Sequence, residues 1–227
     1  MQWDVIVENL PLYASGAWIT IQLLLISLAF GALLAIPLGV LRALGGLPSR
    51  LIWLYTYAFR GTPMLVQLFL IYYGLGQFEW VRGSFAWTWL QSAWFCACLA
   101  FVLNTAAYTT EIVAGAIKAL PAGEIEAAKA YGMDRLTMLR RIVLPQALRR
   151  ALPAYGNEAI FMLHGTALAM LVTLADLTGV AKRIYATHYT PFEAYLTAGA
   201  FYLAMTLALV AIFRWAEHRF LKPLMPR

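Results

Sequence analysis

The sequence predicts an all-α membrane protein with five transmembrane helices, a periplasmic N-terminus and a cytoplasmic C-terminus. Of its 227 residues, 62% are hydrophobic and 12% are charged. A soluble domain carries about 25% charged residues, so the composition excludes a water-soluble globule, a disordered chain and a nucleic-acid-binding protein. Five long apolar runs and the placement of the positive residues predict the same fold class.

Each apolar run is near the length of about 20 residues that crosses a bilayer as a helix. The runs cover residues 17–41, 51–75, 92–117, 151–174 and 195–213. No linker or composition shift divides the chain, so residues 1–227 are expected to form a single transmembrane domain. The N-terminal segment lacks the basic start of a cleaved signal peptide, which predicts that the first run is retained.

The positive residues are unevenly distributed between the two sides that this helix order creates. Thirteen of the 17 Lys and Arg residues fall on one side, three on the other, and Arg60 near the end of the second run. The thirteen are Arg42, Arg50, Lys118, Lys129, Arg135, Arg140, Arg141, Arg149, Arg150, Arg214, Arg219, Lys222 and Arg227. Cytoplasmic loops are enriched in Lys and Arg, so this side is expected to face the cytoplasm. The net charge of +6 then reports topology and not a polyanionic partner.

Two segments on the opposite side have a distinct composition. Residues 77–91 are rich in aromatic side chains, which is typical of a belt at the membrane interface. Residues 176–194 are more polar and are expected to include a short helix at the outer surface.

The loop of residues 118–150 has the pattern of a helix, a turn and a second helix. Pro121 opens the first helix and Gly132 closes it. Asp134 then caps a second short helix, which must end or kink near Pro145. A patterned element of this kind on the cytoplasmic side indicates a docking site for another protein, and the alternative is an interfacial helix without a partner.

The spacing within this loop resembles the EAA motif of membrane subunits in bacterial ABC importers. Glu126-Ala127-Ala128 is followed after three residues by Gly132, and after nine more by Ile142-x-Leu144-Pro145. Other stretches resemble the polar amino-acid permease family over nearly the whole chain; they are Arg60-Gly61-Thr62-Pro63, residues 104–112 and Gly156-Asn157-Glu158. The segments AYTTEIVAGAIKALPAGEIEAAKAYGM, MLHGTAL and YTPFEAY resemble the M-type subunits of histidine/lysine/arginine/ornithine importers.

The resemblance implies a type I ABC importer transmembrane domain whose cytoplasmic loop is a coupling helix. The implied contact positions for the ATPase are Glu126, Ala127, Ala128, Lys129, Tyr131, Gly132, Met133 and Asp134. The implied partners are a homologous membrane permease subunit forming a heterodimer, two ATP-binding subunits and a periplasmic amino-acid-binding protein. No G-x-x-x-x-G-K-[ST] stretch is present, so ATP and Mg²⁺ are expected on the partner ATPase and no cofactor on this chain.

Polar residues inside the third and fourth runs predict a substrate path. Their spacing places most of each set on one helical face, and ionisable residues within a bilayer usually face a cavity or the bundle interior. The set comprises Asn104, Tyr108, Glu111, Asn157, Glu158, Phe161, His164 and Thr166. Its net negative charge suits a cationic ligand. The alternative for Glu111 and Glu158 is a gating or structural role, in which they pair with Arg60 or with the arginines of the loop.

The Arg60-Gly61-Thr62-Pro63 stretch predicts a bend in the second run, because proline removes a backbone donor and disfavours helix at the preceding residue. Arg60, Gly61 and Pro63 are interpreted as a structural bend near the path in preference to a direct substrate site. The chain also departs from many relatives, since His164-Gly165-Thr166 stands where they have Lys-Asp-Thr. An acid that could hold a basic substrate is therefore missing at that position.

The predicted function is a permease subunit that moves basic amino acids (histidine, lysine, arginine, ornithine) across the bacterial inner membrane by alternating access. The alternatives are a permease for other polar amino acids such as glutamine, and a secondary transporter subunit. An intramembrane enzyme is disfavoured, because the runs contain no nucleophile or metal-ligand constellation. Neither catalytic residues nor a metal site is expected, and Cys96 and Cys98 are expected to be small packing residues.

Overall fold

The computed structural model describes residues 3–221, and within that range every regular element is a helix. Lys222 and Arg227, two of the predicted cytoplasmic cations, lie outside the described residues. The helices are α1 (Trp3–Glu8), α2 (Leu10–Leu44), α3 (Gly46–Gly61), α4 (Met64–Phe69), α5 (Glu79–Arg82), α6 (Trp87–Leu90), α7 (Ala93–Lys118), α8 (Ala122–Ala130), α9 (Arg135–Met138), α10 (Leu144–Gly165), α11 (Leu177–His188) and α12 (Pro191–Phe220). Single π-helical turns cover Leu70–Gly74 and Leu139–Val143, and 3₁₀ segments cover Leu75–Gln77 and Thr166–Val172.

Three helices of the described chain are long and apolar enough to cross a membrane by themselves. They are α2, α7 and α12, with mean hydropathies of 2.5, 1.4 and 2.1. A fourth crossing is possible where the continuous helix of residues 135–172 is followed by α11 at a bend of 48°. By length and composition the count is thus three or four, and the five-span topology stays a prediction.

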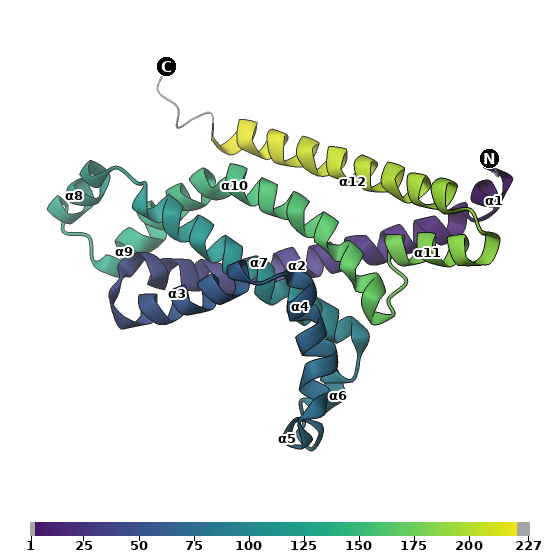
Figure 1. The fold of residues 1–227 in the computed structure, drawn as a ribbon. Helices are drawn as coiled ribbons and strands as arrows, with labels where there is room; N and C mark the ends of the chain where they lie inside the picture. Colours follow the sequence, from purple (N-terminus) through teal and green to yellow (C-terminus); the bar gives the residue numbers. More distant parts are fainter. Residues whose placement is uncertain (1–2, 222–227) are drawn as a thin grey trace.

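The expected second span, residues 51–75, is interrupted in its middle. The chain is extended at Thr62 (φ −117°, ψ 145°) and at Pro63 (φ −62°, ψ 133°), so α3 ends at Gly61 and α4 begins at Met64. The predicted bend is confirmed and is a complete break. Figure 1 shows α3 lying along the bundle, whereas α4 leads away from it toward α5 and α6.

The helices α2 and α7 form the central pair of the bundle, and α2 contacts α7 through small residues. A Cβ added at Gly31 would lie 2.3 Å from Thr105 Cγ2, and one at Gly39 would lie 2.7 Å from Val113 Cγ1. Small residues let two helix backbones approach closely, which is the usual packing device inside membranes. Thr105 and Val113 are themselves buried, so larger residues at either glycine would force the two helices apart.

Helix α11 confirms the short helix expected within residues 176–194. Its first turn is capped by Asp176, which accepts hydrogen bonds from the backbone N–H groups of Thr178 (3.1 Å) and Gly179 (3.2 Å). The helix packs against α2 and α12, and at this end of the bundle the buried Tyr13 hydroxyl donates to the carbonyl of Ala194 (3.0 Å).

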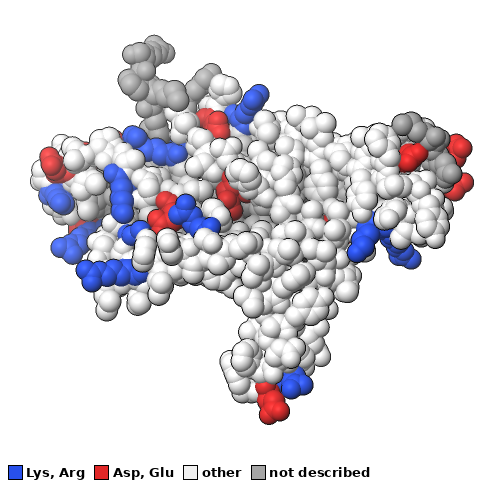
Figure 2. Space-filling view, viewed as in Figure 1, with Lys and Arg blue, Asp and Glu red and all other residues white. Residues whose placement is uncertain are grey.

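The two ends of the molecule differ in composition. Helices α1 and α11 lie at one end of the bundle, and α8 lies at the opposite end together with the C-terminal part of α12 (Figure 1). In Figure 2, Lys and Arg side chains gather around the end that holds α8 and α9. This asymmetry is the one that the positive-inside rule associates with a cytoplasmic end.

Candidate functional site

A pocket of about 530 Å³ lies where the α3–α4 break meets α7 and α10. Its lining comprises Thr62, Pro63, Met64, Asn104, Tyr108, Ile112, Ala154, Asn157, Glu158, Phe161 and Met162. The structure thus brings five of the eight predicted path residues together, along with Pro63 of the predicted bend. The five are Asn104, Tyr108, Asn157, Glu158 and Phe161.

Glu158 is the one acidic residue in this lining, and its side chain is largely buried, with the residue 7% exposed. No Lys or Arg of residues 3–221 comes within ion-pair distance of its carboxylate. Two carboxamides, Asn104 and Asn157, and the Tyr108 phenol add hydrogen-bonding groups to the same pocket. A buried charge is costly unless an opposite charge or hydrogen bonds compensate it, so a cationic group inside the pocket would stabilise an ionised Glu158.

Gln67 holds the break in place, and the sequence reasoning missed it. Because Pro63 interrupts the helix, carbonyl groups at the end of α3 lose their intrahelical donors. The Gln67 amide donates to the carbonyls of Phe59 (2.7 Å) and Thr62 (3.0 Å), and its nitrogen is 2.8 Å from the Thr62 hydroxyl. Its carbonyl oxygen accepts a hydrogen bond from Asn104 Nδ2 (2.9 Å). Gln67 therefore joins the break to a pocket residue. The one feature of the sequence that could have indicated this role is a single amide within the apolar stretch LVQLFL.

Arg60 lies beside the pocket and contacts Tyr108 in two ways. Its guanidinium carbon is 5.3 Å from the centroid of the Tyr108 ring, which is the geometry of a cation–π contact. The Tyr108 hydroxyl also donates a long hydrogen bond to the Arg60 carbonyl (3.4 Å). The last turn of α3 is thereby fixed to α7, and a positive charge stands near the pocket lining. A Cβ added at the next residue, Gly61, would have no neighbouring atom within 4 Å.

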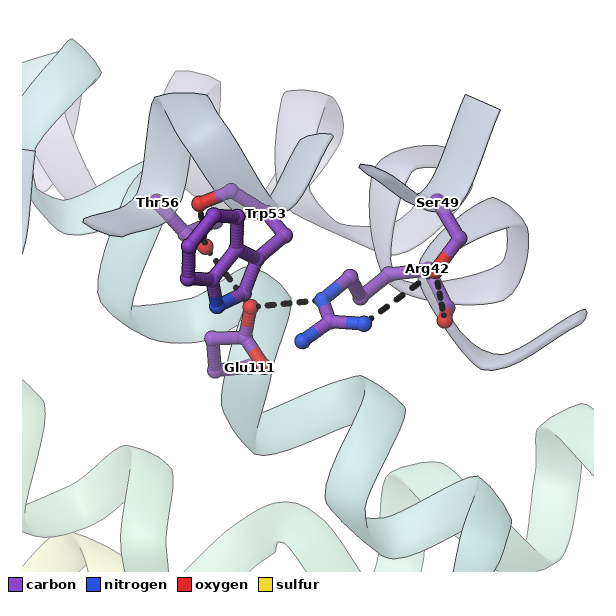
Figure 3. A network of polar contacts seen from close by, with 5 residues as sticks. All are labelled: Arg42, Ser49, Trp53, Thr56 and Glu111. Atoms are coloured by element: carbon purple, nitrogen blue, oxygen red, sulfur yellow. Dashed lines mark hydrogen bonds and ion pairs between the residues drawn. The ribbon is translucent and has the colours of Figure 1, made fainter. Parts of the chain in front are cut away.

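Glu111 belongs to a separate network outside the pocket, shown in Figure 3. One carboxylate oxygen, Oε1, is 2.9 Å from Arg42 Nε and accepts a hydrogen bond from Thr56 Oγ1 (2.7 Å). Arg42 Nη1 donates in turn to Ser49 Oγ (3.1 Å), whose hydroxyl donates to the Arg42 carbonyl (2.8 Å). Among the described residues the ion-pair partner of Glu111 is Arg42, while Arg60, one of the partners considered in the structural alternative, acts on it from farther away. Arg42 lies in the last turn of α2, and its contacts with Glu111 and Ser49 connect α2 to α7 and α3.

His164 and Thr166 also lie outside the pocket. His164 is seven positions after Asn157, which is about 10 Å along a helix. Its ring therefore lies beyond the end of the pocket and contacts α12. There its Nε2 is 3.2 Å from Thr206 Oγ1. The buried Thr166 hydroxyl donates to the carbonyl of Leu163 (2.6 Å), as the helix tightens into its 3₁₀ segment.

The loop of residues 118–150 has the predicted helix–turn–helix form. Helix α8 begins directly after Pro121, and the chain turns at Gly132 with φ +73°. Asp134 caps α9 by accepting hydrogen bonds from the N–H groups of Leu136 and Thr137 (3.1 Å each). Hydrogen bonds from the side chain and the backbone N–H of Thr137 hold the pKa of the Asp134 carboxyl below its usual value. Near Pro145 the helix does not stop, but passes through a π-helical turn into α10.

Most of the implied coupling positions are exposed in this chain. Tyr131 is 86% exposed, whereas Ala128 is buried at 3% and faces the rest of the protein. The exposed members are Glu126, Ala127, Lys129, Tyr131, Gly132, Met133 and Asp134. A hydrogen bond between Glu124 and Gln146 connects α8 to the start of α10, a helix that also lines the pocket.

The described residues contain no group of three or more His, Cys, Asp or Glu side chains arranged to hold a metal ion. Cys96 and Cys98 are both buried and neither forms a disulfide.

This arrangement of helices, pocket and exposed loop corresponds to a known class of membrane transport component. Residues 27–222 match the family described as the inner membrane component of binding-protein-dependent transport systems, and the chain belongs to that family.

Named relatives narrow the comparison. The chain is 47% identical over 214 residues to the histidine/lysine/arginine/ornithine transport system permease protein HisM of Escherichia coli K12, which covers 93% of this chain and 90% of that protein. It is 45% identical over 217 residues to the octopine transport system permease protein OccM of Rhizobium radiobacter, covering 90% and 86%. A solved structure, described as an amino acid ABC transporter with histidines, has a TM-score of 0.85 at 32% identity and covers 96% of this chain and 99% of its own. The MetNI methionine ABC transporter shares the fold, with a TM-score of 0.71 at 21% identity.

Proposed function

We propose that this chain is the permease subunit of an ATP-driven importer that moves basic amino acids across the bacterial inner membrane. The single observation that carries the proposal is the pocket at the α3–α4 break, in which Glu158 is the one acidic lining residue and has no Lys or Arg of residues 3–221 within ion-pair distance, Arg60 acting on it only from farther away. A guanidinium, ammonium or imidazolium side chain would supply the missing charge. The relative named for histidine, lysine, arginine and ornithine transport supports this substrate class.

A second candidate is a permease for polar amino acids in general, including glutamine. The position of Arg60 favours it, because its guanidinium lies over Tyr108, a residue of the pocket lining. Arg60 and Glu158 would then pair with the α-carboxylate and the α-ammonium group that all amino acids share. The relatives named for octopine and nopaline transport add opines to the substrates to be tested.

The pocket opens on one side of a single chain, and five of its lining residues are exposed: Thr62, Pro63, Ala154, Asn157 and Phe161. A second membrane subunit, homologous to this one, would cover that side and complete the path. The relatives' class also supports two ATP-binding subunits and a periplasmic amino-acid-binding protein as partners. The exposed face of α8 is proposed to dock on an ATPase subunit, whose movement switches the helices between inward- and outward-facing states.

The direct test of substrate class is ATP hydrolysis by the reconstituted complex with its binding protein. Arginine, lysine, histidine, ornithine, glutamine and octopine are compared at equal concentrations. Stimulation by the four basic amino acids and not by glutamine supports the proposal, and equal stimulation by glutamine supports the second candidate. Gradient-driven uptake without any ATPase subunit would reject both.

Coupling through α8 is tested at a pair of glycines. Gly132 has φ +73° and Gly123 lies within α8 with an ordinary φ, and neither has any atom within 4 Å of an added Cβ. Alanine at a left-handed position costs about 1–2 kcal/mol. We therefore expect Gly132→Ala to lower substrate-stimulated ATP hydrolysis several-fold while membrane insertion is unchanged, and Gly123→Ala to leave both as they are. Equal behaviour of the two variants would reject the docking role of this turn.

A further inference from the structure

A second cavity, of about 610 Å³, lies beneath the coupling loop at the ends of α2 and α7. Its floor is formed by apolar side chains from these two helices and from the turn that leads into α10. Its lining comprises Val40, Ala43, Leu44, Ile117, Ile125, Lys129, Arg135, Leu136, Met138, Leu139 and Val143. We call this second cavity the groove. It shares no lining residue with the pocket at the α3–α4 break and is therefore a distinct site.

The groove combines an apolar floor with two positive charges and no negative one. Lys129 and Arg135 are its charged lining residues, and none of the lining residues is Asp or Glu. Neither cation has a carboxylate within ion-pair distance in the described part of the chain. The nearby Asp134 is engaged by the N–H groups at the start of α9. An occupant with an anionic head and an apolar body would match both features.

The groove also continues an apolar surface that the topology places in the membrane. It begins between the ends of α2 and α7, two of the three helices able to cross a bilayer. Two of its lining residues, Leu44 and Leu136, are 74% and 53% exposed. On the proposed orientation this end faces the cytoplasm, where basic pockets between transmembrane helices receive anionic headgroups.

We propose that this groove binds an anionic phospholipid, with an acyl chain along its apolar floor and the phosphate held by Lys129 and Arg135. The site rests on the proposed orientation of the permease. Ile125 and Lys129 face the groove, whereas Ala127 lies about half a helical turn away on the side of α8 proposed for the ATPase. Of the proposed ATPase contacts, only Lys129 is also a groove residue, so a bound lipid would support α8 from beneath and leave the other contacts free.

The test is native mass spectrometry of the complete transporter, purified in mild detergent and supplied with phosphatidylglycerol or with phosphatidylethanolamine of the same acyl chains. We expect tighter retention of phosphatidylglycerol. Removing one cation near an anionic headgroup weakens binding about fivefold, so Arg135→Gln is expected to have that effect. The matched control is Arg50→Gln, which removes an exposed arginine of α3 outside the groove.

A second variant separates the apolar contribution from the charge. Ala43→Phe fills the floor of the groove without altering any charge and is expected to reduce retention of both lipids. Size-exclusion profiles and copurification of the ATPase establish that each variant is assembled. Arginine-stimulated ATP hydrolysis is measured on the same samples, so that failure of the substrate proposal is recognised separately.

Three outcomes would overturn the lipid site. They are equal retention of the two lipids, an equal effect of Arg135→Gln and Arg50→Gln, and retention by the single chain that disappears in the assembled complex. The last result would mean that the ATPase covers the groove. The lipid site is supported if Arg135→Gln selectively reduces phosphatidylglycerol retention and Ala43→Phe reduces retention of both lipids.

Discussion

Glu111 and Glu158 are two acids inside the apolar helices of one chain, and their surroundings differ. Glu111 on α7 has an arginine 2.9 Å away and a threonine hydroxyl at 2.7 Å, and all of these groups come from the chain itself. Glu158 on α10 lines an open pocket and has no ion-pair partner among the residues that the structure describes. The first acid has an ion-pair partner within the chain, and the second has only the more distant charge of Arg60.

The difference shows how position decides the role of an intramembrane charge. The Glu111 network joins three helices near the end of α2 and fixes their mutual position, as Figure 3 shows. The Glu158 pocket lies at a break in the helix and is also lined by the polar side chains of Asn104, Tyr108 and Asn157. We therefore propose a structural role for Glu111 and a ligand-binding role for Glu158, and the following experiments are designed to separate the two.

The largest effect is expected from Glu158→Gln, which removes the one acidic group of the pocket lining while preserving its shape. A hydrogen bond to a charged group contributes about 1.5–3 kcal/mol, so the arginine concentration for half-maximal uptake into proteoliposomes should rise roughly 10–150-fold. Glu111→Gln is the matched control and should leave that concentration within about twofold. A larger rise in the Glu111 variant than in the Glu158 variant would reverse the assignment.

A smaller effect is expected from Gln67→Leu, which preserves side-chain bulk but removes every hydrogen bond of the amide. The carbonyls of Phe59 and Thr62 lose their donor, and Asn104 loses an acceptor. Unsatisfied buried groups cost about 1–3 kcal/mol. We expect weaker uptake of all amino acids alike, because the pocket is displaced while its charge is intact. Loss of arginine uptake alone would show that Gln67 contacts the cationic side chain.

The Arg42–Glu111 pair is expected to affect stability and not selectivity. Its side chains are about one-fifth exposed, 19% and 22%, so solvent screens part of the interaction. Each single variant, Arg42→Gln or Glu111→Gln, leaves one charge without its partner, and the double variant removes both. Thermal unfolding should give a coupling free energy of about 1–2 kcal/mol in this cycle. Additive single effects would mean that the two residues do not stabilise each other.

The smallest effect is expected from Thr56→Val, which is nearly isosteric. It removes the buried hydroxyl that donates to Glu111 Oε1 (2.7 Å) and leaves the arginine contact intact. One hydrogen bond contributes about 1 kcal/mol, so the melting temperature should fall slightly and arginine uptake should be unchanged. Thr62→Val is the comparison variant, because it removes a hydroxyl that lies at the break and in the pocket lining instead of in the Glu111 network. A selectivity change in the Thr56 variant would connect the Glu111 network to substrate recognition.

The sequence was sufficient to predict those elements whose determinants are local. Pro63 specifies the bend, Asp134 the cap of α9 and Gly132 the left-handed turn, since each acts on its own backbone or on residues within a few positions. The helical spacing of Asn104 and Tyr108, and of Asn157 and Phe161, likewise predicted which faces line the pocket.

Contacts between distant segments could not be predicted in this way. The pairing of Arg42 with Glu111 joins residues 69 positions apart, and it depends on how closely α2 packs on α7. His164 has the helical spacing of a pocket residue, yet it lies too far along α10 and contacts Thr206 instead. Gln67 was missed because its role arises only once the chain has broken at Pro63 and left carbonyls to be satisfied.

The assignment of Glu158 to the cationic side chain is tested most directly by the ratio of arginine-stimulated to glutamine-stimulated ATP hydrolysis. The ratio is measured for the reconstituted complex and for its Glu158→Gln and Glu111→Gln variants. We expect the ratio to fall at least tenfold in the Glu158 variant, on the order of a lost charged hydrogen bond, and to stay constant in the Glu111 variant. An unchanged ratio in the Glu158 variant, with both amino acids equally weakened, would contradict it, because Glu158 would then bind the α-ammonium group common to both substrates.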